Sequence, residues 1–184
     1  MERNSSRGGP HCVNRQQGTH GAEEGALCYA LAGTKRLEWL VIRIRPARPD
    51  EAAALTGLVL RSKAQWGYGE EFLALCREEL QILRAHVAER HEGPPLGIFT
   101  IRGAPPEGTL EHLYVDPSAM GLGVGRTLLR AARDIARSSG FSALLIHSDP
   151  TAEAFYLHEG AVHAGSVPSG SVPGRMLPLL KLEL

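Results

Sequence analysis

Apolar residues change their spacing along the chain, and the changes predict a run of alternating strands and helices. Between Leu40 and Arg45, Ile42 and Ile44 alternate with residues that face the other way, which predicts a first strand. A helix is predicted to open at Arg48, because a proline suited to the first helical turn and two acidic residues follow it. A Trp-Gly-Tyr-Gly break precedes a second helix over Glu70–Leu83.

The remaining part of the sequence, a little over half, repeats this alternation. Further strands are predicted at His86–Arg90, Leu96–Ile101, Leu110–Val115, Ser142–His147 and Leu177–Leu184, with helices at Val124–Arg137 and Thr151–Glu159. The continuous apolar run in Ser142–His147 is typical of a central strand buried on both faces. The order predicts an α/β fold around a mixed sheet. A tandem Gly-Ser-Val-Pro, at Gly165–Pro168 and Gly170–Pro173, is predicted to be a loop hinge.

The beginning of the chain differs from the rest. Residues 1–24 are rich in Ser, Arg, Gly, Asn, Gln and His and nearly lack aliphatic side chains, so they cannot form a core. We therefore expect residues 1–36 to be a disordered N-terminal extension and residues 37–184 to form one folded domain.

Composition narrows the choice of partners. Lys plus Arg and Asp plus Glu both number 20, so no net charge attracts the chain to nucleic acid or to an anionic membrane. The three cysteines are far apart and show no metal-ligand spacing, and their odd number is atypical of a secreted disulfide framework. This usage predicts free thiols in the cytoplasm. No apolar run reaches the roughly 18 residues of a membrane span.

A glycine-rich turn joins the strand that ends at Val115 to the helix that begins at Val124. It contains Gly121, Gly123 and Gly125. The first turn of a helix has N–H groups without partners, and glycines let an anion approach them closely, so the turn predicts a phosphate site. A dinucleotide turn would place its third glycine one residue later, and a nucleotide P-loop would need a glycine at Met120 and a lysine at Arg126. A glycine turn that binds nothing also fits the pattern.

A second segment, Asp149–Ala161, and the glycine-rich turn both resemble sequence motifs of one known family. The stretch from Met120 to Gly125 resembles the pyrophosphate loop Arg/Gln-x-x-Gly-x-Gly/Ala of the GNAT N-acetyltransferases. The segment DPTAEAFYLHEGA resembles that family's Asn-x-x-Ala-x-x-Phe-Tyr-x-x-x-Gly-Phe block, with differences at its first and last positions. The resemblance implies a mixed, mostly antiparallel central sheet flanked by helices. It also implies that strands four and five, here Leu110–Val115 and Ser142–His147, splay apart.

The resemblance also implies a chemistry and a set of site residues. The cosubstrate would be acetyl-CoA, and the acceptor a primary amine of a small molecule or peptide, with a homodimer compatible with the family. Tyr156 would donate to the leaving thiolate, and Glu111 would be the base, with His112 on the opposite face as the fallback and a water chain with no single base as the other alternative. Asp149 would touch the cofactor or cap the turn at Thr151. The remaining contacts implied for the cofactor are Leu113, Tyr114, Val115, Gly121, Leu122, Gly123, Val124, Gly125 and Arg126. The acceptor would meet Trp66, Tyr68 and Arg175.

Two other functions remain open on the sequence. A catalytically inactive acyl-CoA-binding module would have the same fold and the same cofactor site. A small P-loop-like nucleotide-binding protein would require both departures from the P-loop pattern to be tolerated.

Overall fold

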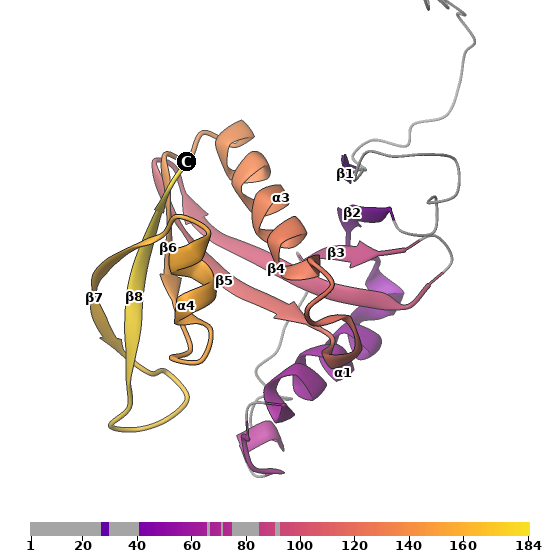
Figure 1. The fold of residues 1–184 in the computed structure, drawn as a ribbon, viewed down its shortest axis with the longest axis horizontal. Helices are drawn as coiled ribbons and strands as arrows, with labels where there is room; N and C mark the ends of the chain where they lie inside the picture. Colours follow the sequence, from indigo (N-terminus) through magenta and orange to yellow (C-terminus); the bar gives the residue numbers. More distant parts are fainter. Residues whose placement is uncertain (1–26, 30–40, 66, 71, 75–84, 91–92) are drawn as a thin grey trace, which may run out of the picture.

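The strands of the protein form one sheet. The computed structural model describes residues 27–29, 41–65, 67–70, 72–74, 85–90 and 93–184. In these ranges eight strands follow one another across the sheet in the order β1-β2-β3-β4-β5-β6-β8-β7 (Figure 1). The strands are β1 (Leu27–Tyr29), β2 (Ile42–Pro46), β3 (His86–Glu89), β4 (Pro95–Ala104), β5 (Glu107–Val115), β6 (Ala143–His147), β7 (Val162–Pro168) and β8 (Met176–Glu183). The helices are α1 (Ala52–Ala64), α3 (Val124–Ser138) and α4 (Glu153–His158), with 3-10 turns η2 (Pro49–Glu51) and η3 (Pro117–Ala119).

The sheet is mostly antiparallel, and its parallel pair opens partway along. Among the described strands, only β5 and β6 run parallel. Their register ends where Thr109 meets Leu145. Beyond that point β5 continues to Val115 along β4 alone, and the two strands part (Figure 1). The predicted mixed sheet with splayed strands is confirmed.

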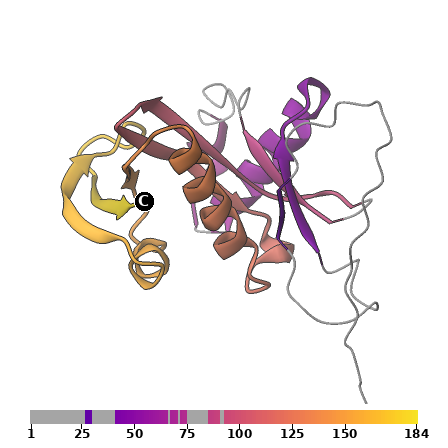
Figure 2. The same ribbon diagram turned by 90° about the horizontal axis from the view of Figure 1, so that it is seen from above.

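Helices cover both faces of the sheet because neighbouring residues of a strand point to opposite sides. Ile98 of β4 packs in a cluster with Leu55 and Val59 of α1. Its neighbour Phe99 belongs to the larger core beneath α3 and α4, which includes Leu128 and Tyr156. Figure 2 shows α1 and α3 on the two sides of the sheet. The gap between β5 and β6 is therefore bordered by helices on both faces.

Two of the predictions lie partly outside the described residues. Strand β1 falls inside the segment expected to be a disordered extension, and it pairs antiparallel with β2. The rest of that segment up to residue 36 is not described, so the boundary at residue 37 stays a prediction. The helix expected over Glu70–Leu83 is described only at Glu70 and residues 72–74, which are helical.

The tandem Gly-Ser-Val-Pro segments do not form the loop that was predicted. The first copy, Gly165–Pro168, belongs to β7 and pairs with β8. The register shifts between His163 and Gly165, and Gly165 has a φ of +135°, so the strand is irregular where the pattern suggested a turn. Only the second copy, Gly170–Pro173, lies in the turn before β8.

Gly97 of β4 provides a test of how closely α3 packs on the sheet. A Cβ atom at this position would lie 2.6 Å from the carbonyl oxygen of Tyr114 and 2.8 Å from Cδ1 of Leu128. We expect Gly97→Ala to destabilise the protein by about 1–3 kcal/mol, because the neighbouring strand and helix must move apart. Urea unfolding measures the change. Gly170→Ala is the control, since nothing lies within 4 Å of its Cβ position. Equal midpoints for the two variants would contradict the close packing.

Candidate active site

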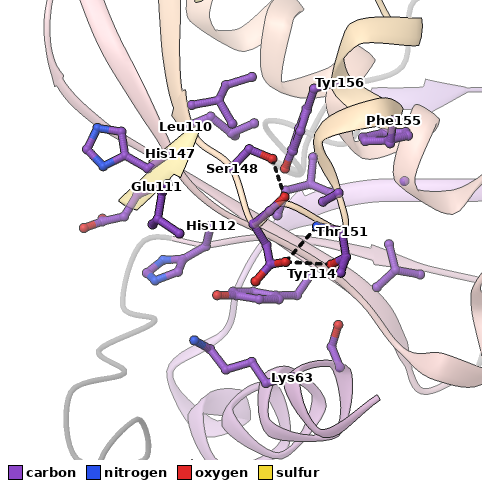
Figure 3. Close-up of a pocket in the computed structure, with 18 of the residues that line it drawn as sticks. Lys63, Leu110, Glu111, His112, Tyr114, His147, Ser148, Thr151, Phe155 and Tyr156 are labelled. Carbon is purple, nitrogen blue, oxygen red and sulfur yellow. Dashed lines mark hydrogen bonds between the residues drawn. The ribbon is translucent and has the colours of Figure 1, made fainter. Parts of the chain in front are cut away.

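A cavity of about 750 Å³ lies where β5 and β6 part (Figure 3). Its walls come from α1, β5, the loop before α3, the end of β6, α4 and the loop between β7 and β8. Most of the predicted site residues line it: Tyr68, Glu111, Leu113, Tyr114, Val115, Gly121, Gly123, Gly125, Arg126, Asp149, Tyr156 and Arg175. The side chain of Leu122 is exposed and that of Val124 is buried in the core. Trp66 lies outside the described residues.

The loop before α3 presents main-chain N–H groups that have no acceptor within the described part of the chain. These groups belong to Gly121, Gly123, Val124, Gly125 and Arg126. Helix α3 contributes 15 residues, and its dipole places partial positive charge at the same end. The loop therefore has the donors and the electrostatics to hold a phosphate or diphosphate group.

Glycines give the loop its shape. Gly121 and Gly123 have φ values of +75° and +79°, a region that other residues avoid. At Gly125 a Cβ would lie in ordinary van der Waals contact, 3.6 Å from the Phe155 ring and 3.7 Å from Val115. The first turn of α3 therefore lies close to α4 and β5.

Tyr156 of α4 extends from the core into this cavity. The residue is only 7% exposed, and its ring packs edge-on against Phe155 with centroids 5.0 Å apart. No described residue forms a hydrogen bond with its hydroxyl group. Burial raises the pKa of the phenol above its ordinary value, so the hydroxyl stays protonated at neutral pH. It is a donor available to a group bound in the cavity.

A β-bulge in β5 changes the predicted directions of Glu111 and His112. Thr100 of β4 pairs with His112, whereas Ile101 pairs with Leu110, so Glu111 is an extra residue in the ladder. A bulge interrupts the alternation of faces. Both Glu111 and His112 line the cavity, and the prediction that they point to opposite faces is wrong. Glu111 forms an ion pair with Arg102 of β4 at 2.6 Å.

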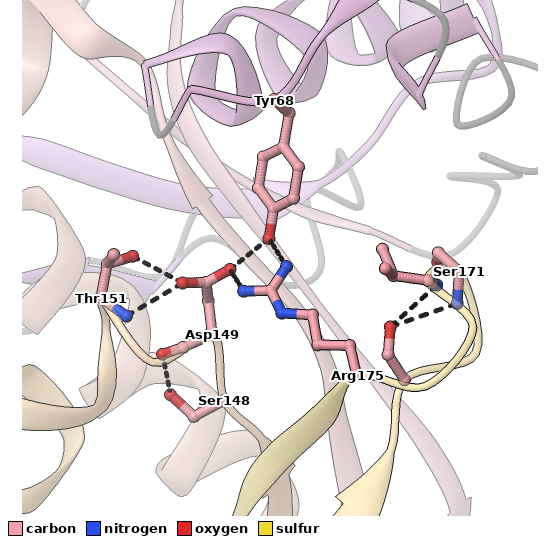
Figure 4. A network of polar contacts seen from close by, with 8 residues as sticks. Tyr68, Ser148, Asp149, Thr151, Ser171 and Arg175 are labelled. Carbon is pink, nitrogen blue, oxygen red and sulfur yellow. Dashed lines mark hydrogen bonds and ion pairs between the residues drawn. The ribbon is translucent and has the colours of Figure 1, made fainter.

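Three of the predicted residues join in one polar cluster, formed by Tyr68, Asp149 and Arg175 (Figure 4). The Tyr68 hydroxyl donates to Asp149, and Arg175 donates to the Tyr68 oxygen at 2.6 Å and to Asp149 at 3.1 Å. The other oxygen of Asp149 accepts from the main chain and the hydroxyl of Thr151 at 2.9 and 2.7 Å. Asp149 therefore caps the turn before α4 at Thr151, which is one of the two roles considered for it from the sequence.

The charge of Asp149 is stabilised by these contacts. Burial opposes its ionisation, but the hydrogen bonds from Tyr68 and Thr151 outweigh burial and lower its pKa. Both carboxylate oxygens already accept two hydrogen bonds, which leaves little capacity for a cofactor contact. The cluster connects the segment after α1 with the ends of β6 and β8 across the cavity, so its main effect is on the shape of this part of the cavity.

The edge of β5 offers a second set of main-chain groups. Leu113, Tyr114 and Val115 lie beyond the last residue that pairs with β6, so their groups on that side face the cavity. An extended chain bound there would find the hydrogen bonds that a neighbouring strand would otherwise make. Arg126, at the start of α3, is paired with Glu159 at 2.6 Å on a largely exposed surface. Its charge is therefore partly neutralised at the cavity mouth.

Lys63 and Ser148 line the cavity and Thr100 contacts the lining residue His112, and none of the three was identified from the sequence. Lys63 places its Nζ 5.2 Å from the Phe72 ring and 5.6 Å from the Tyr114 ring, inside the cavity. Helical spacing contained a signal for it, since Lys63 follows the buried Val59 by four residues. Thr100 and Ser148 had no such signal, because their roles depend on strand pairing across the sheet.

Comparison with known proteins agrees with this arrangement of loop, strands and tyrosine. Residues 59–160, more than half of the chain, match the model of the acetyltransferase (GNAT) family. The chain therefore belongs to the GNAT acetyltransferase family.

Solved structures of this family share the fold. A GCN5-related N-acetyltransferase from Rhodopseudomonas palustris is 23% identical, with a TM-score of 0.65 over 77% of this chain and 94% of that one. The PaiA N-acetyltransferase from Thermoplasma acidophilum, solved with coenzyme A, is 18% identical, with a TM-score of 0.67 over 78% and 99%. A GNAT acetyltransferase from Brucella melitensis, solved with acetyl-CoA, is 19% identical, with a TM-score of 0.55 over 77% and 87%.

A search of functionally curated proteins finds no match to the sequence. Among the described helices, none is long and apolar enough to cross a membrane.

Proposed function

We propose that the protein is an acetyl-CoA-dependent N-acetyltransferase that moves an acetyl group to a primary amine of a small molecule or peptide. One observation carries the proposal. The free N–H groups before α3, the edge of β5 beyond its pairing with β6 and the Tyr156 hydroxyl all line one cavity. This arrangement fits the diphosphate, the pantetheine chain and the thioester of acetyl-CoA in turn.

Acetyl-CoA supplies an activated acyl group, and the chain's own residues orient and polarise it. The N–H groups of Gly121 and Gly123–Arg126 would bind the diphosphate, whereas the Leu122 N–H already donates to Ala119. The main chain of Leu113–Val115 would pair with pantetheine. Tyr156 would direct its hydroxyl toward the sulfur atom. These positions support direct attack of the amine on the thioester, without an acetylated enzyme.

The amine must lose a proton during the reaction. A lysine-like amine has a pKa near roughly 10.4, so removing its proton at about pH 7 costs about 4–5 kcal/mol unless a base accepts it. Glu111 stays a candidate for this role, and His112 lies beside it in the cavity wall. Tyr68 and Arg175 lie on the acceptor side. The guanidinium of Arg175 has five N–H donors, so some remain for a carboxylate or phosphate on the acceptor.

Two measurements test the proposal. Calorimetry should detect binding of acetyl-CoA and none of ATP; the reverse result would favour the nucleotide-binding alternative. A thiol-release assay should then show turnover with at least one member of a panel of spermidine, tyramine, leucine amide and a lysine-containing peptide. Binding of acetyl-CoA with no turnover on the panel or on an amine-rich cell extract would favour the inactive acyl-CoA-binding module.

A further inference from the structure

His112 and Thr100 form a hydrogen-bonded pair between two neighbouring strands. They stand directly opposite each other in the β4–β5 register, and Thr100 Oγ1 lies 2.8 Å from His112 Nδ1. Thr100 is only 7% exposed, so its hydroxyl group has a fixed place in the structure. The contact fixes the orientation of the imidazole ring, which forms part of the cavity wall (Figure 3).

The charged groups around the ring come from three elements. Glu111 lies next to it on β5, Arg102 lies on β4, and Lys63 reaches in from α1. Burial lowers the pKa of His112; Glu111 opposes this effect, whereas Lys63 and Arg102 add to it. The Tyr114 ring lies 5.8 Å away. His112 is therefore an uncharged imidazole at neutral pH, which is the form that can accept a proton.

Glu111 and His112 differ in their suitability as the base. One carboxylate oxygen of Glu111 is engaged by the guanidinium of Arg102 at 2.6 Å, so this side chain is oriented toward β4 by a partner that His112 lacks. An ordinary imidazole, with a pKa near roughly 6.5, is a stronger base than an ordinary carboxylate, with a pKa near roughly 4.3, although burial lowers the pKa of His112 from that starting value. The most effective general base is the one whose pKa lies nearer the working pH.

We infer that Nε2 of His112 takes the proton of the acceptor amine, and that Thr100 positions the ring for this role. The inference rests on the proposed function. When the Nδ1–H group donates to the Thr100 oxygen, the lone pair of Nε2 is directed away from Thr100 and is free to accept.

The proton and electron transfers balance in this scheme. The amine nitrogen bonds to the acetyl carbon while the carbon–sulfur bond breaks, and the electron pair of that bond stays on sulfur beside the Tyr156 hydroxyl. Before the attack, the ammonium form of the amine gives one proton to Nε2 of His112, which passes it to solvent, and the nitrogen loses its second proton to solvent as the amide forms. Solvent returns one proton to the thiolate.

The first experiment determines which nitrogen of the His112 ring carries the proton. Nitrogen-15 NMR of the histidine side chains, assigned with His112→Gln, should show the Nδ1–H tautomer of His112 at pH 7.5. Thr100→Val should abolish this preference, because valine has a similar shape but no hydroxyl group. Finding the Nε2–H tautomer in the unmodified protein would overturn the inference. This result needs no acceptor and is independent of whether the proposed function holds.

The second experiment measures kcat and KM as a function of pH, with acetyl-CoA and the amine of the panel that reacts fastest. We expect His112→Gln to lower kcat by about 10²–10⁴ and to remove the acid limb of the kcat/KM profile. Glu111→Gln should keep that limb. Thr100→Val should lower kcat by about 10-fold with an unchanged KM and a shifted limb. His163→Gln, on β7 outside the cavity, controls for the loss of a histidine.

The outcomes separate the two claims. Loss of the acid limb in Glu111→Gln, with its retention in His112→Gln, would overturn the role of His112 and leave the acetyltransferase proposal standing. A wild-type protein that binds no acetyl-CoA would instead remove the proposed function, and with it the inference. Partial rescue of His112→Ala by added imidazole would support a proton transfer at this position.

Discussion

Tyr156→Phe is expected to lower kcat by about 10²–10³ while the Kd for acetyl-CoA changes less than about threefold. The substitution removes one oxygen from a residue that is 7% exposed and leaves the ring contact with Phe155 in place. Loss of a single donor aimed at developing charge has a cost of this size in other enzymes. Thiol release measures kcat, and calorimetry with acetyl-CoA measures Kd.

The acidity of the phenol determines how Tyr156 would act. A coenzyme thiol has a pKa near roughly 8.5, taking cysteine as its model, and an ordinary phenol near roughly 10. Burial raises the pKa of Tyr156 further, so transfer of its proton to the thiolate is uphill. We therefore expect Tyr156 to stabilise the thiolate by a hydrogen bond without ionising. Below about pH 10, the pH profiles of kcat for the wild type and for Tyr156→Phe should therefore have the same shape on the basic side. Turnover equal to that of the wild type would remove its assigned role.

The sequence predicted most of the elements because their apolar spacing is set locally. The alternation around Ile42 and Ile44 became β2, with both side chains buried, and the helical stripe after the glycine turn became α3, which begins at Val124 as expected. The glycine turn and the Tyr156 helix were also placed correctly relative to each other, since both line the cavity.

The details of the site that were missed depend on residues far apart in the chain. Strand alternation cannot reveal an inserted residue, so the bulge at Glu111 and its effect on His112 were not predictable. The Tyr68–Asp149–Arg175 cluster joins residues as many as 107 positions apart, and only the folded chain brings them together. Strand β7 was missed because its residues are almost all exposed at the sheet edge, where no alternation of apolar side chains marks a strand.

Gly123→Val is expected to weaken acetyl-CoA binding by about 10- to 100-fold. Gly123 has a φ of +79° and directly precedes α3. A β-branched residue is strained in this region by roughly 1–2 kcal/mol or more, so the loop must change its backbone angles. The free N–H groups of Gly121 and Gly123–Arg126 would then no longer point at one diphosphate. Calorimetry with acetyl-CoA measures the loss.

Two comparisons separate this effect from general damage to the fold. Pantetheine has no diphosphate, so its weak binding along β5 should be unchanged by Gly123→Val. Gly140→Val is the matched variant, because Gly140 has a φ of +86° at the other end of α3 and lies outside the cavity. It introduces the same kind of strain into the same helix, and it should lower stability while keeping the affinity for acetyl-CoA. If Gly140→Val weakened binding of acetyl-CoA as much as Gly123→Val, the loss would reflect general damage to α3. The proposed diphosphate site at the free N–H groups before α3 would then have to be abandoned.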